Sequence, residues 1–536
     1  MRALPGAGPQ PRLLMAVLAV FIISAAVSGW SVSRNFEGGL THEFCQYSEI
    51  GRNIRAGEGL RSRMIYSSAL ATLDERGIPF EEYNPVLDRF PLPAWLTAAA
   101  QALFGETDAA ALILSVLALA ALAAGTAYIA GLLLGPGAAL AAGLIVALCP
   151  TLQRGFILWG LPDLGFAAIT LAAIGLLISL RRNPAPGIYW AIAGIAGGLA
   201  WLYRSNFMLW LPLLALWIYK RGGPADGGRA RNRLLWWTGG FLLAAAPGLA
   251  NNLHWYGSIN PPTMPWNLAH HVITETPPWL HYRVFTPGET LHQPLLLAGK
   301  WFTLLWQHLK SWPALWQFHL VWPAAAWGAA RLWRKRREES AAFEGAAVYL
   351  AMLALQVCVF CFLRFEELGP LAGGRYYLWF IPAAAILAVR GAGDLKLLPR
   401  GIYFAAVLAF AAWWLVSPQG KTAYPGGLPV KDWPELREAA LAAGEHGLVA
   451  TNLPGQVVWY ARRRSLHLPS YPADLEAIMR KHKVDAVLLT RLPLGEPECL
   501  PGWRAIATDP KALKEFSLKN GFTRYKDLGT SVLLAR

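Results

Sequence analysis

The chain has 536 residues, of which 55% are apolar, and it contains 25 tryptophans. This composition is too apolar for a soluble enzyme of the same length and predicts a protein that crosses a membrane many times. The formal net charge of +15 would suit a nucleic-acid-binding protein, but the basic residues cluster in short loops between apolar runs, so we predict a membrane and no nucleic acid as partner.

The basic clusters predict the orientation of the chain. They occur at residues 181–182, 220–233, 331–337 and 390–400. The positive-inside rule places such clusters in the cytoplasm. The N-terminus, with Arg2 and Arg12, is then also inside, and the acidic segment that follows the first apolar run is outside. We therefore expect an integral protein of the bacterial inner membrane.

The first apolar run, 13–32, is longer than a signal-peptide core of roughly 7 to 15 residues and is interpreted as a retained transmembrane helix. A first extracytoplasmic loop is expected at about 34–107. Within it, the apolar run 91–104 would span only about 21 Å as a helix, against about 30 Å for the hydrocarbon core. This run is therefore expected to be an interfacial or re-entrant helix on the outer face.

The later apolar runs predict about eleven transmembrane helices, within a range of 11 to 13, in a membrane domain over residues 1–418. An outer turn is expected around Arg204, because a guanidinium in lipid is costly. A second extracytoplasmic loop is expected at about 251–312. The long run 294–332 is divided into an outer-surface helix and a crossing from about Pro313.

The composition changes at about residue 419. From there to residue 536, short β-rich runs alternate with helical ones, which is the pattern of a small soluble α/β domain. The expected strands are 448–451, 484–490 and 531–534, and the expected helices are 472–481 and 510–519. On the predicted orientation this domain is extracytoplasmic.

The stretch 41–60 carries the first candidate site residue. Its pattern predicts a helix that begins at a Thr41 N-cap, ends at Gly57, and has Glu43, Tyr47 and Ile50 on one face. Glu43 then lies in the first turn, where the helix dipole stabilises an ionised carboxylate. Such a group suits a proton acceptor or a cation ligand, although a carboxylate that only stabilises the helix start has the same pattern.

Several charged residues converge on the expected outer interface of the membrane. Ionisable groups at helix ends that face a cavity are candidates for a functional site, because burying them is costly. The set is Glu43, Asp88, Arg89, Asp163, Arg204, Glu366, Glu367 and Arg375. The sequence has no phosphate-binding loop of the GxxxxGKS or GxxxxGKT form, no HExxH and no DxD motif, so we expect no nucleotide cofactor.

Two of these segments carry a family resemblance. EFCQYSEIGRNIRAGEG, residues 43–59, is similar to the DExxYxxIAxNIxxGxG segment of GT-C integral-membrane glycosyltransferases, the group of the protein O-mannosyltransferases and the lipid A aminoarabinose transferase. DRFPLPAWLTAAAQALFG, residues 88–105, resembles their EKPPLYYWL...LFG segment. Leu161-Pro162-Asp163 resembles their TD turn, and GLAWLYRSN and GGRYYLWFIP resemble later membrane segments.

The resemblance implies an all-α polytopic fold of GT-C type with the small α/β domain appended. It implies a donor sugar on a polyprenyl monophosphate and a glycan, lipid or protein acceptor. Glu43 aligns with the catalytic base of the family, Asp88 with the carboxylate before Lys-Pro, and Arg89 with that lysine, which meets the donor phosphate. The chain departs from the family pattern in having Glu43 for Asp, Phe44 for an acidic residue and Phe90 for Pro.

The resulting hypothesis is an enzyme, a glycosyltransferase whose base takes the proton of an acceptor hydroxyl while guanidinium groups stabilise the leaving phosphate. The candidate catalytic residues are Glu43 and Asp163, the candidate substrate-binding residues are Tyr47, Arg89, Arg204 and Arg375, and the candidate ligands of a divalent metal ion are Asp88 and Asp163. Two other functions share these features: a transporter or flippase of a lipid-linked or small polar substrate, and a non-catalytic envelope-assembly protein with the same fold.

Overall fold

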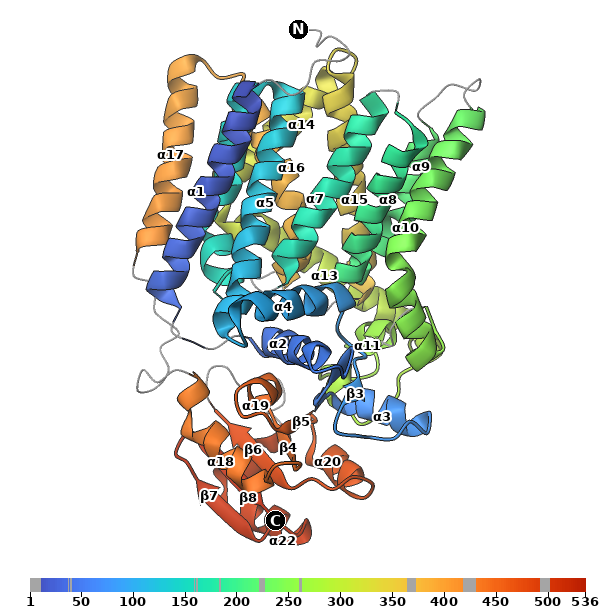
Figure 1. The fold of residues 1–536 in the computed structure, drawn as a ribbon, viewed down its shortest axis with the longest axis vertical. Coiled ribbons are helices and arrows are strands. Elements are labelled where there is room, and N and C mark those ends of the chain that lie inside the picture. Colours follow the sequence, from blue (N-terminus) through green and yellow to red (C-terminus); the bar gives the residue numbers. More distant parts are fainter. Residues whose placement is uncertain are drawn as a thin grey trace.

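The computed structural model describes residues 11–36, 38, 41–158, 160, 162–182, 185–220, 227–259, 263–363, 373–417, 430–491 and 502–536. A bundle of roughly parallel helices occupies one end of the molecule, and a mixed sheet flanked by helices occupies the other (Figure 1). Between them lies a layer of shorter helices that run across the ends of the bundle. This middle layer holds the residues of the candidate site.

Five helices of the described chain are long and apolar enough to cross a membrane. They are α1 (Pro11–Asn35), α5 (Asp108–Leu134), α7 (Asp163–Arg182), α15 (Ser340–Leu363) and α17 (Leu397–Val416). The bundle also contains α6 (Pro136–Ala147), α8 (Gly187–Tyr203), α9 (Leu211–Tyr219), α10 (Gly227–Tyr256), α14 (Val321–Arg334) and α16 (Ile381–Ala392). The chain is an integral membrane protein, and the number of crossings stays a prediction.

Glycines let neighbouring helices of the bundle touch. A Cβ atom on Gly194 of α8 would lie 2.0 Å from the carbonyl oxygen of Trp237 in α10, and one on Gly240 of α10 would lie 2.1 Å from that of Ala191. Small residues at such crossings allow the close backbone approach that drives helix association in membranes. The α8–α10 contact therefore fixes the position of α8, which ends at the candidate site.

The segment predicted as the first extracytoplasmic loop forms the middle layer. It contains α2 (His42–Arg55), β1 (Arg61–Ser62), β2 (Met64–Ile65), α3 (Ser67–Glu75), β3 (Asn84–Pro85) and α4 (Pro91–Phe104). The Thr41 hydroxyl caps α2 by accepting from Phe44 N, as predicted, and the helix stops before Gly57, which has a φ of +88°. Figure 1 shows α4 lying across the ends of the bundle helices, the arrangement expected of an interfacial helix.

The second loop follows α10 and has little regular structure. Its elements are α11 (Thr263–Ala269), η4 (Pro278–Leu280), α12 (Pro287–Leu291), α13 (Pro294–Ser311) and η5 (Trp312–Gln317). The predicted break near Pro313 is present, because Trp316 has a φ of 58° and ends the helical run. The next helix of the bundle, α14, therefore begins at Val321, several residues later than the crossing expected from about Pro313.

The C-terminal domain contains a six-stranded sheet with the order β2-β5-β4-β6-β8-β7. Its own strands are β4 (Leu448–Thr451), β5 (Arg464–His467), β6 (Ala486–Thr490), β7 (Arg524–Asp527) and β8 (Ser531–Ala535). Its helices are η7 (Val430–Asp432), α18 (Pro434–Ala443), α19 (Pro454–Trp459), α20 (Pro472–Met479), α21 (Arg504–Thr508) and α22 (Pro510–Lys519). The predicted strands correspond to β4, β6 and β8, and the predicted helices to α20 and α22.

One strand of this sheet comes from the first loop. Met64 and Ile65 of β2 pair in parallel with Ser465 and Leu466 of β5. Two residues of extended chain give no period-2 pattern, so the sequence offered no sign of this strand. The C-terminal sheet is thus completed by a strand from the loop that carries Glu43.

A buried carboxylate ties this strand region to α2. Glu49 accepts hydrogen bonds from the Ser62 hydroxyl at 2.7 Å, from the Arg63 backbone N–H at 3.1 Å and from the Asn53 amide at 2.5 Å. Burial raises the pKa of Glu49, although Arg52 and these donors act in the opposite direction. Glu49 is therefore a structural group that ties α2 to β1 and to the residue before β2.

Candidate functional site

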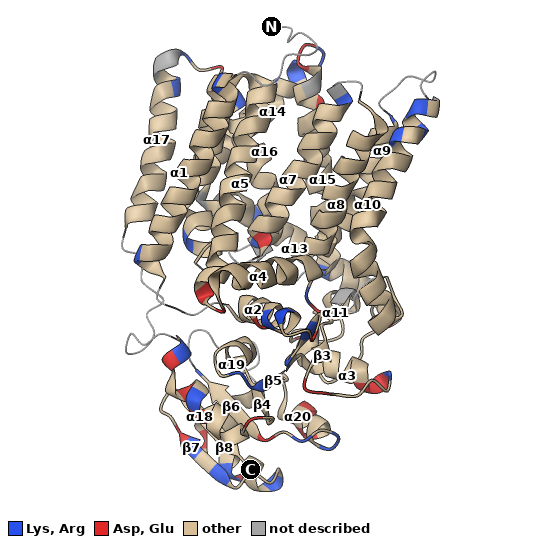
Figure 2. Cartoon of the chain, in the orientation of Figure 1, with Lys and Arg blue, Asp and Glu red and all other residues tan. Residues whose placement is uncertain are grey.

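The candidate residues are contributed by four parts of the chain that meet where the middle layer covers the bundle. Glu43 lies in α2, Asp88 and Arg89 lie between β3 and α4, Asp163 and Arg204 lie at facing ends of α7 and α8, and Arg375 lies in η6 (Gly373–Phe380). Figure 2 shows charged residues at this level inside an otherwise uncharged bundle. Glu366 and Glu367, also expected at this interface, lie outside the described residues.

Glu43 forms an ion pair with Arg375. The Arg375 guanidinium donates from Nη1 to Glu43 Oε2 at 2.8 Å and from Nη2 to the Tyr376 hydroxyl at 2.7 Å. Burial raises the pKa of Glu43, but the charges of Arg375, Arg89, Arg204 and His42 together bring it well below its ordinary value. Glu43 is therefore an ionised carboxylate, as its place in the first turn predicts.

A second ion pair joins the ends of α7 and α8. Asp163 is the first residue of α7 and is 1% exposed, and Arg204 Nη1 donates to its Oδ1. Arg204 leaves the helix with an extended backbone, φ −157° and ψ 137°, which turns its side chain toward α7. Asp163 Oδ2 is buried and has no hydrogen-bond partner among the described residues.

Tyr376 links these two ion pairs. The guanidinium carbon of Arg204 lies 4.7 Å from the centre of its ring, and that of Arg375 lies 4.9 Å from it. Both cations thus contact the same aromatic ring, which favours their close approach. The sequence analysis did not identify Tyr376 as a site residue, although its position directly after Arg375 in GGRYYLWF could have indicated it.

Arg89 and Asp88 form a third ion pair, at 3.0 Å between Arg89 Nη1 and Asp88 Oδ2. Arg89 also donates from Nη2 to the Tyr66 hydroxyl at 3.0 Å, and its guanidinium carbon lies 5.8 Å from the centres of the Tyr47 and Tyr66 rings. The Tyr47 hydroxyl accepts a hydrogen bond from Phe90 N at 3.2 Å. Tyr47 therefore holds the segment that carries Arg89 and contacts the guanidinium itself.

The C-terminal domain reaches the site through His467. Its ring stacks on Tyr66 with centres 4.9 Å apart, and it meets His42 edge to face at 6.2 Å. The Tyr66 hydroxyl is also 3.0 Å from Nε2 of His42, the residue next to Glu43. The sequence analysis did not identify His42, Tyr66 or His467 as candidate site residues.

The two predicted metal ligands are each paired with a guanidinium. Asp88 contacts Arg89 and Asp163 contacts Arg204. Across the described ranges, no group of three or more His, Cys, Asp and Glu side chains could hold a metal ion. A divalent cation on either carboxylate would lie beside the guanidinium that already compensates its charge, so this donor set does not fit a metal site.

Comparison with known proteins gives a family model and solved structures. The model of the dolichyl-phosphate-mannose-protein mannosyltransferase family matches residues 88–249, a stretch that includes Asp88, Arg89, Asp163 and Arg204. No curated protein sequence matches the chain. The family match and the solved structures agree with the resemblance seen in residues 43–59 and 88–105.

Two solved structures have similar folds. ArnT from Cupriavidus metallidurans bound to undecaprenyl phosphate has a TM-score of 0.55 and 12% identity, over 97% of this chain and 97% of that one. An oligosaccharyltransferase of Archaeoglobus fulgidus in complex with Zn and sulfate has a TM-score of 0.51 and 12% identity, over 88% of this chain and 68% of that one. The chain therefore has the GT-C membrane fold with a small C-terminal sheet domain.

Proposed function

We propose that this chain, with its GT-C fold and three ion pairs beneath the first loop, is an integral-membrane glycosyltransferase that takes its sugar from a polyprenyl-phosphate donor. The observation that carries the proposal is the position of Glu43. It is an ionised carboxylate close to three guanidinium groups, of which that of Arg204 is buried and those of Arg89 and Arg375 are partly buried. A site of this kind has both a proton acceptor and a place for a phosphate.

The three arginines suit a phosphate that is held in a membrane. A guanidinium presents paired N–H donors that match phosphate oxygens, and it keeps its charge in an apolar setting. Arg89, Arg204 and Arg375 reach the site from separate elements of the fold. The name of the matched family includes dolichyl-phosphate-mannose. The ArnT structure is bound to undecaprenyl phosphate. Both support a lipid phosphate as the leaving group here.

In the proposed reaction the acceptor hydroxyl attacks the anomeric carbon of the donor sugar with inversion. The new bond joins the acceptor oxygen to that carbon, the bond from that carbon to the phosphate oxygen breaks, and the polyprenyl phosphate leaves with the electron pair. The acceptor proton passes to Glu43. Arginine N–H groups stabilise the charge that builds on the phosphate.

The ion pair between Glu43 and Arg375 supplies a way to couple donor binding to base strength. While Arg375 contacts the carboxylate, the pKa of Glu43 is low, and the group is a weak base. A donor phosphate that draws Arg375 away removes the largest of the charges that lower this pKa. Glu43 then becomes a stronger base only when the donor is in place.

The other candidate residues have supporting roles in this proposal. Asp163 holds Arg204 through Oδ1 and offers Oδ2 to a substrate hydroxyl. Tyr47 positions Arg89, and Asp88 compensates its charge. The predicted divalent metal ion has no role in the mechanism, because its two candidate ligands already serve arginines.

We further propose that the site and the sheet domain face the extracytoplasmic side of a bacterial inner membrane. Figure 2 shows lysines and arginines at the loops of the opposite end of the bundle, which is the distribution of cytoplasmic loops. The stacking of His467 on Tyr66 places the sheet domain over the site, where it would orient a glycan, lipid or protein acceptor.

The proposal is tested with purified protein in lipid nanodiscs that contain undecaprenyl-phosphate sugars. Release of undecaprenyl phosphate in the presence of membrane extracts, and mass spectrometry of envelope glycans with and without the protein, identify the sugar and the acceptor. Transport without sugar transfer would instead support a flippase, and neither activity would support an assembly protein.

A further inference from the structure

A polar side chain inside the helix bundle has no part in the reaction proposed above. Helix α15 contains a single amide residue, Gln356, in the apolar run LALQVCVF. Gln356 is fully buried. An amide inside a membrane helix is costly unless its N–H and C=O groups are hydrogen-bonded, so the partners of this amide indicate its role.

Both ends of the Gln356 amide contact η6, the segment that carries Arg375. Gln356 Nε2 donates to the Tyr376 backbone carbonyl at 2.8 Å, and Gln356 Oε1 accepts from the Trp379 indole N–H at 2.9 Å. A carbonyl only accepts and an indole N–H only donates, so these partners determine the orientation of the amide. Tyr376 and Trp379 are one turn of 3₁₀ helix apart. One side chain of α15 therefore holds a full turn of η6.

This turn contains the aromatic ring that the two ion pairs share. The guanidinium groups of Arg204 and Arg375 both contact the ring of Tyr376, at 4.7 and 4.9 Å from its centre. The ring can serve both cations only while the backbone of Tyr376 stays in place. The hydrogen bond from Gln356 to the Tyr376 carbonyl holds that backbone.

The other partner of the amide reaches the segment that follows Arg204. The ring of Trp379 lies 4.5 Å from the ring of Trp210, centre to centre. Trp210 is the last residue of η2 (Ser205–Trp210), which begins directly after Arg204. The two segments that bring Arg204 and Arg375 to the site thus meet at residues that Gln356 holds.

We propose that Gln356 is a positioning residue of the candidate site. It holds the Tyr376 ring where both guanidinium groups contact it, and it thereby keeps Arg375 on Glu43. Gln356 acts through η6 and not by contact with a substrate. Its consequence for the reaction rests on the proposed function, in which these two guanidinium groups bind the donor phosphate.

The first experiment needs no substrate. Thermal unfolding of the purified full-length protein in detergent is compared for wild type, Glu43→Gln, Gln356→Met and the double variant. Methionine has the length of glutamine and no amide, so it fills the same space without holding η6. Glu43→Gln should lower the unfolding temperature about half as much, or less, in the Gln356→Met background as in wild type, because the ion pair that it removes is already weakened. Equal decreases in both backgrounds would overturn the proposal.

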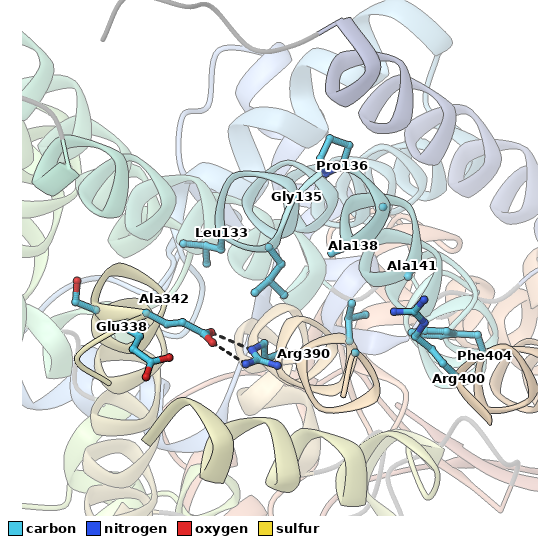
Figure 3. Close-up of a pocket in the computed structure, with 16 residues that line it drawn as sticks. Leu133, Gly135, Pro136, Ala138, Ala141, Glu338, Ala342, Arg390, Arg400 and Phe404 are labelled. Carbon is cyan, nitrogen blue, oxygen red and sulfur yellow. Dashed lines mark hydrogen bonds and ion pairs between the residues drawn. The ribbon is translucent and has the colours of Figure 1, made fainter. Parts of the chain in front are cut away.

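The ion pair between Glu339 and Arg390 provides the matched control. Arg390 donates to both carboxylate oxygens of Glu339, at 3.0 and 2.6 Å. Figure 3 shows this contact in the wall of a cavity of about 990 Å³, which is lined by the end of α5 remote from the middle layer. About 25 Å of helix separates Glu339 from Gln356. Glu339→Gln should therefore lower the unfolding temperature equally with and without Gln356→Met. If Gln356→Met weakens both ion pairs alike, its effect is general and the positioning role is wrong.

Gln356→Glu tests whether the two hydrogen bonds carry the effect. A protonated carboxyl donates one hydrogen bond and accepts another, and a carboxyl buried in apolar surroundings stays protonated at about pH 6. At this pH, Glu43→Gln should lower the unfolding temperature as much in the Gln356→Glu background as in wild type. A smaller decrease in this background would contradict the assigned hydrogen bonds.

The second experiment separates this inference from the proposed function. In nanodiscs, kcat/KM for the undecaprenyl-phosphate sugar should fall about tenfold in Gln356→Met and recover in Gln356→Glu, because the guanidinium groups are first displaced and then restored. An unchanged kcat/KM in Gln356→Met would overturn the positioning role. A wild-type protein that transfers no sugar would contradict the proposed function alone, and the unfolding measurements would still decide the role of Gln356.

Discussion

The carboxylate of Glu43 and the guanidinium of Arg375 lie 332 positions apart in the sequence and 2.8 Å apart in the structure. This contact connects the first loop to the membrane segment that precedes α16. It also sets the electrostatic state of the proposed base, because Arg375 is the largest of the neighbouring charges that lower the pKa of Glu43.

Replacing Glu43 tests the catalytic assignment. Glu43→Gln keeps the size of the side chain and removes the proton acceptor, so the turnover number should fall by about 100-fold to 10,000-fold. Release of undecaprenyl phosphate in nanodiscs measures this change. Glu58→Gln, at an exposed position directly after the same helix, serves as the control and should keep the activity. Full activity of Glu43→Gln would show that another group takes the proton.

The low pKa of Glu43 predicts how stability depends on pH. A carboxylate with a lowered pKa stabilises the folded state fully above its ordinary value of 4.5 and progressively less below it. Glu43→Gln should therefore lower the thermal unfolding temperature most at pH 7 and somewhat less at pH 3.5, because the rest of the contribution is lost only as the pH falls further toward the lowered folded-state pKa. A difference between variant and wild type that is the same at both pH values would contradict the ion pair.

The Asp163–Arg204 pair predicts strong coupling in stability. Removing one partner leaves the other charge buried, which costs about 3 to 5 kcal/mol, whereas removing both costs much less than the sum. Unfolding of Asp163→Asn, Arg204→Gln and the double variant by denaturant in detergent gives the coupling. Additive effects would mean that the two side chains do not interact.

Chelation of divalent metal should leave the enzyme active. The carboxylates of Asp88 and Asp163 are occupied by Arg89 and Arg204, so dialysis against EDTA should change the rate of undecaprenyl phosphate release by less than about twofold. Loss of activity that returns with a single added metal would instead assign a metal to these carboxylates.

The stack of His467 on Tyr66 predicts an effect of the sheet domain on donor binding. His467→Ala removes the ring that supports Tyr66 and, through it, Arg89, so KM for the lipid donor should rise about twofold to tenfold with little change in kcat. His467→Phe keeps the ring and should restore KM. If kcat falls instead and Phe does not restore it, the imidazole has a direct role.

The parts of the fold that follow from local signals were predictable. The Thr41 cap and Gly57 delimit α2, α7 begins at Asp163 after the Pro162 turn, and the chain breaks at Arg204 where a charge could not stay in lipid. The apolar runs likewise gave β4, β6 and β8 of the soluble domain. Each of these features depends on residues within a few positions of one another.

The partnerships within the site were not predictable from local signals. The sequence identified Glu43, Asp163, Arg204 and Arg375 as charges at one interface, but it could not say which carboxylate pairs with which guanidinium, because pairing depends on how α2, α7, α8 and η6 pack. It assigned Arg375 to the substrate, which stays a prediction, and gave no sign that its guanidinium also contacts Glu43. Tyr376 lies between the two ion pairs, and the only sequence feature that pointed to it was its position directly after Arg375.

The strand β2 has a consequence for how the protein matures. Its partner β5 lies far along the chain. A hydrogen bond beside this pairing gives the scale, because the Ser67 hydroxyl donates to the His467 carbonyl across 400 positions. The ribosome therefore releases the loop that carries Glu43 long before the strand that pairs with β2, and until then β2 is an unpaired edge. A chain that ends before β5 lacks this pairing.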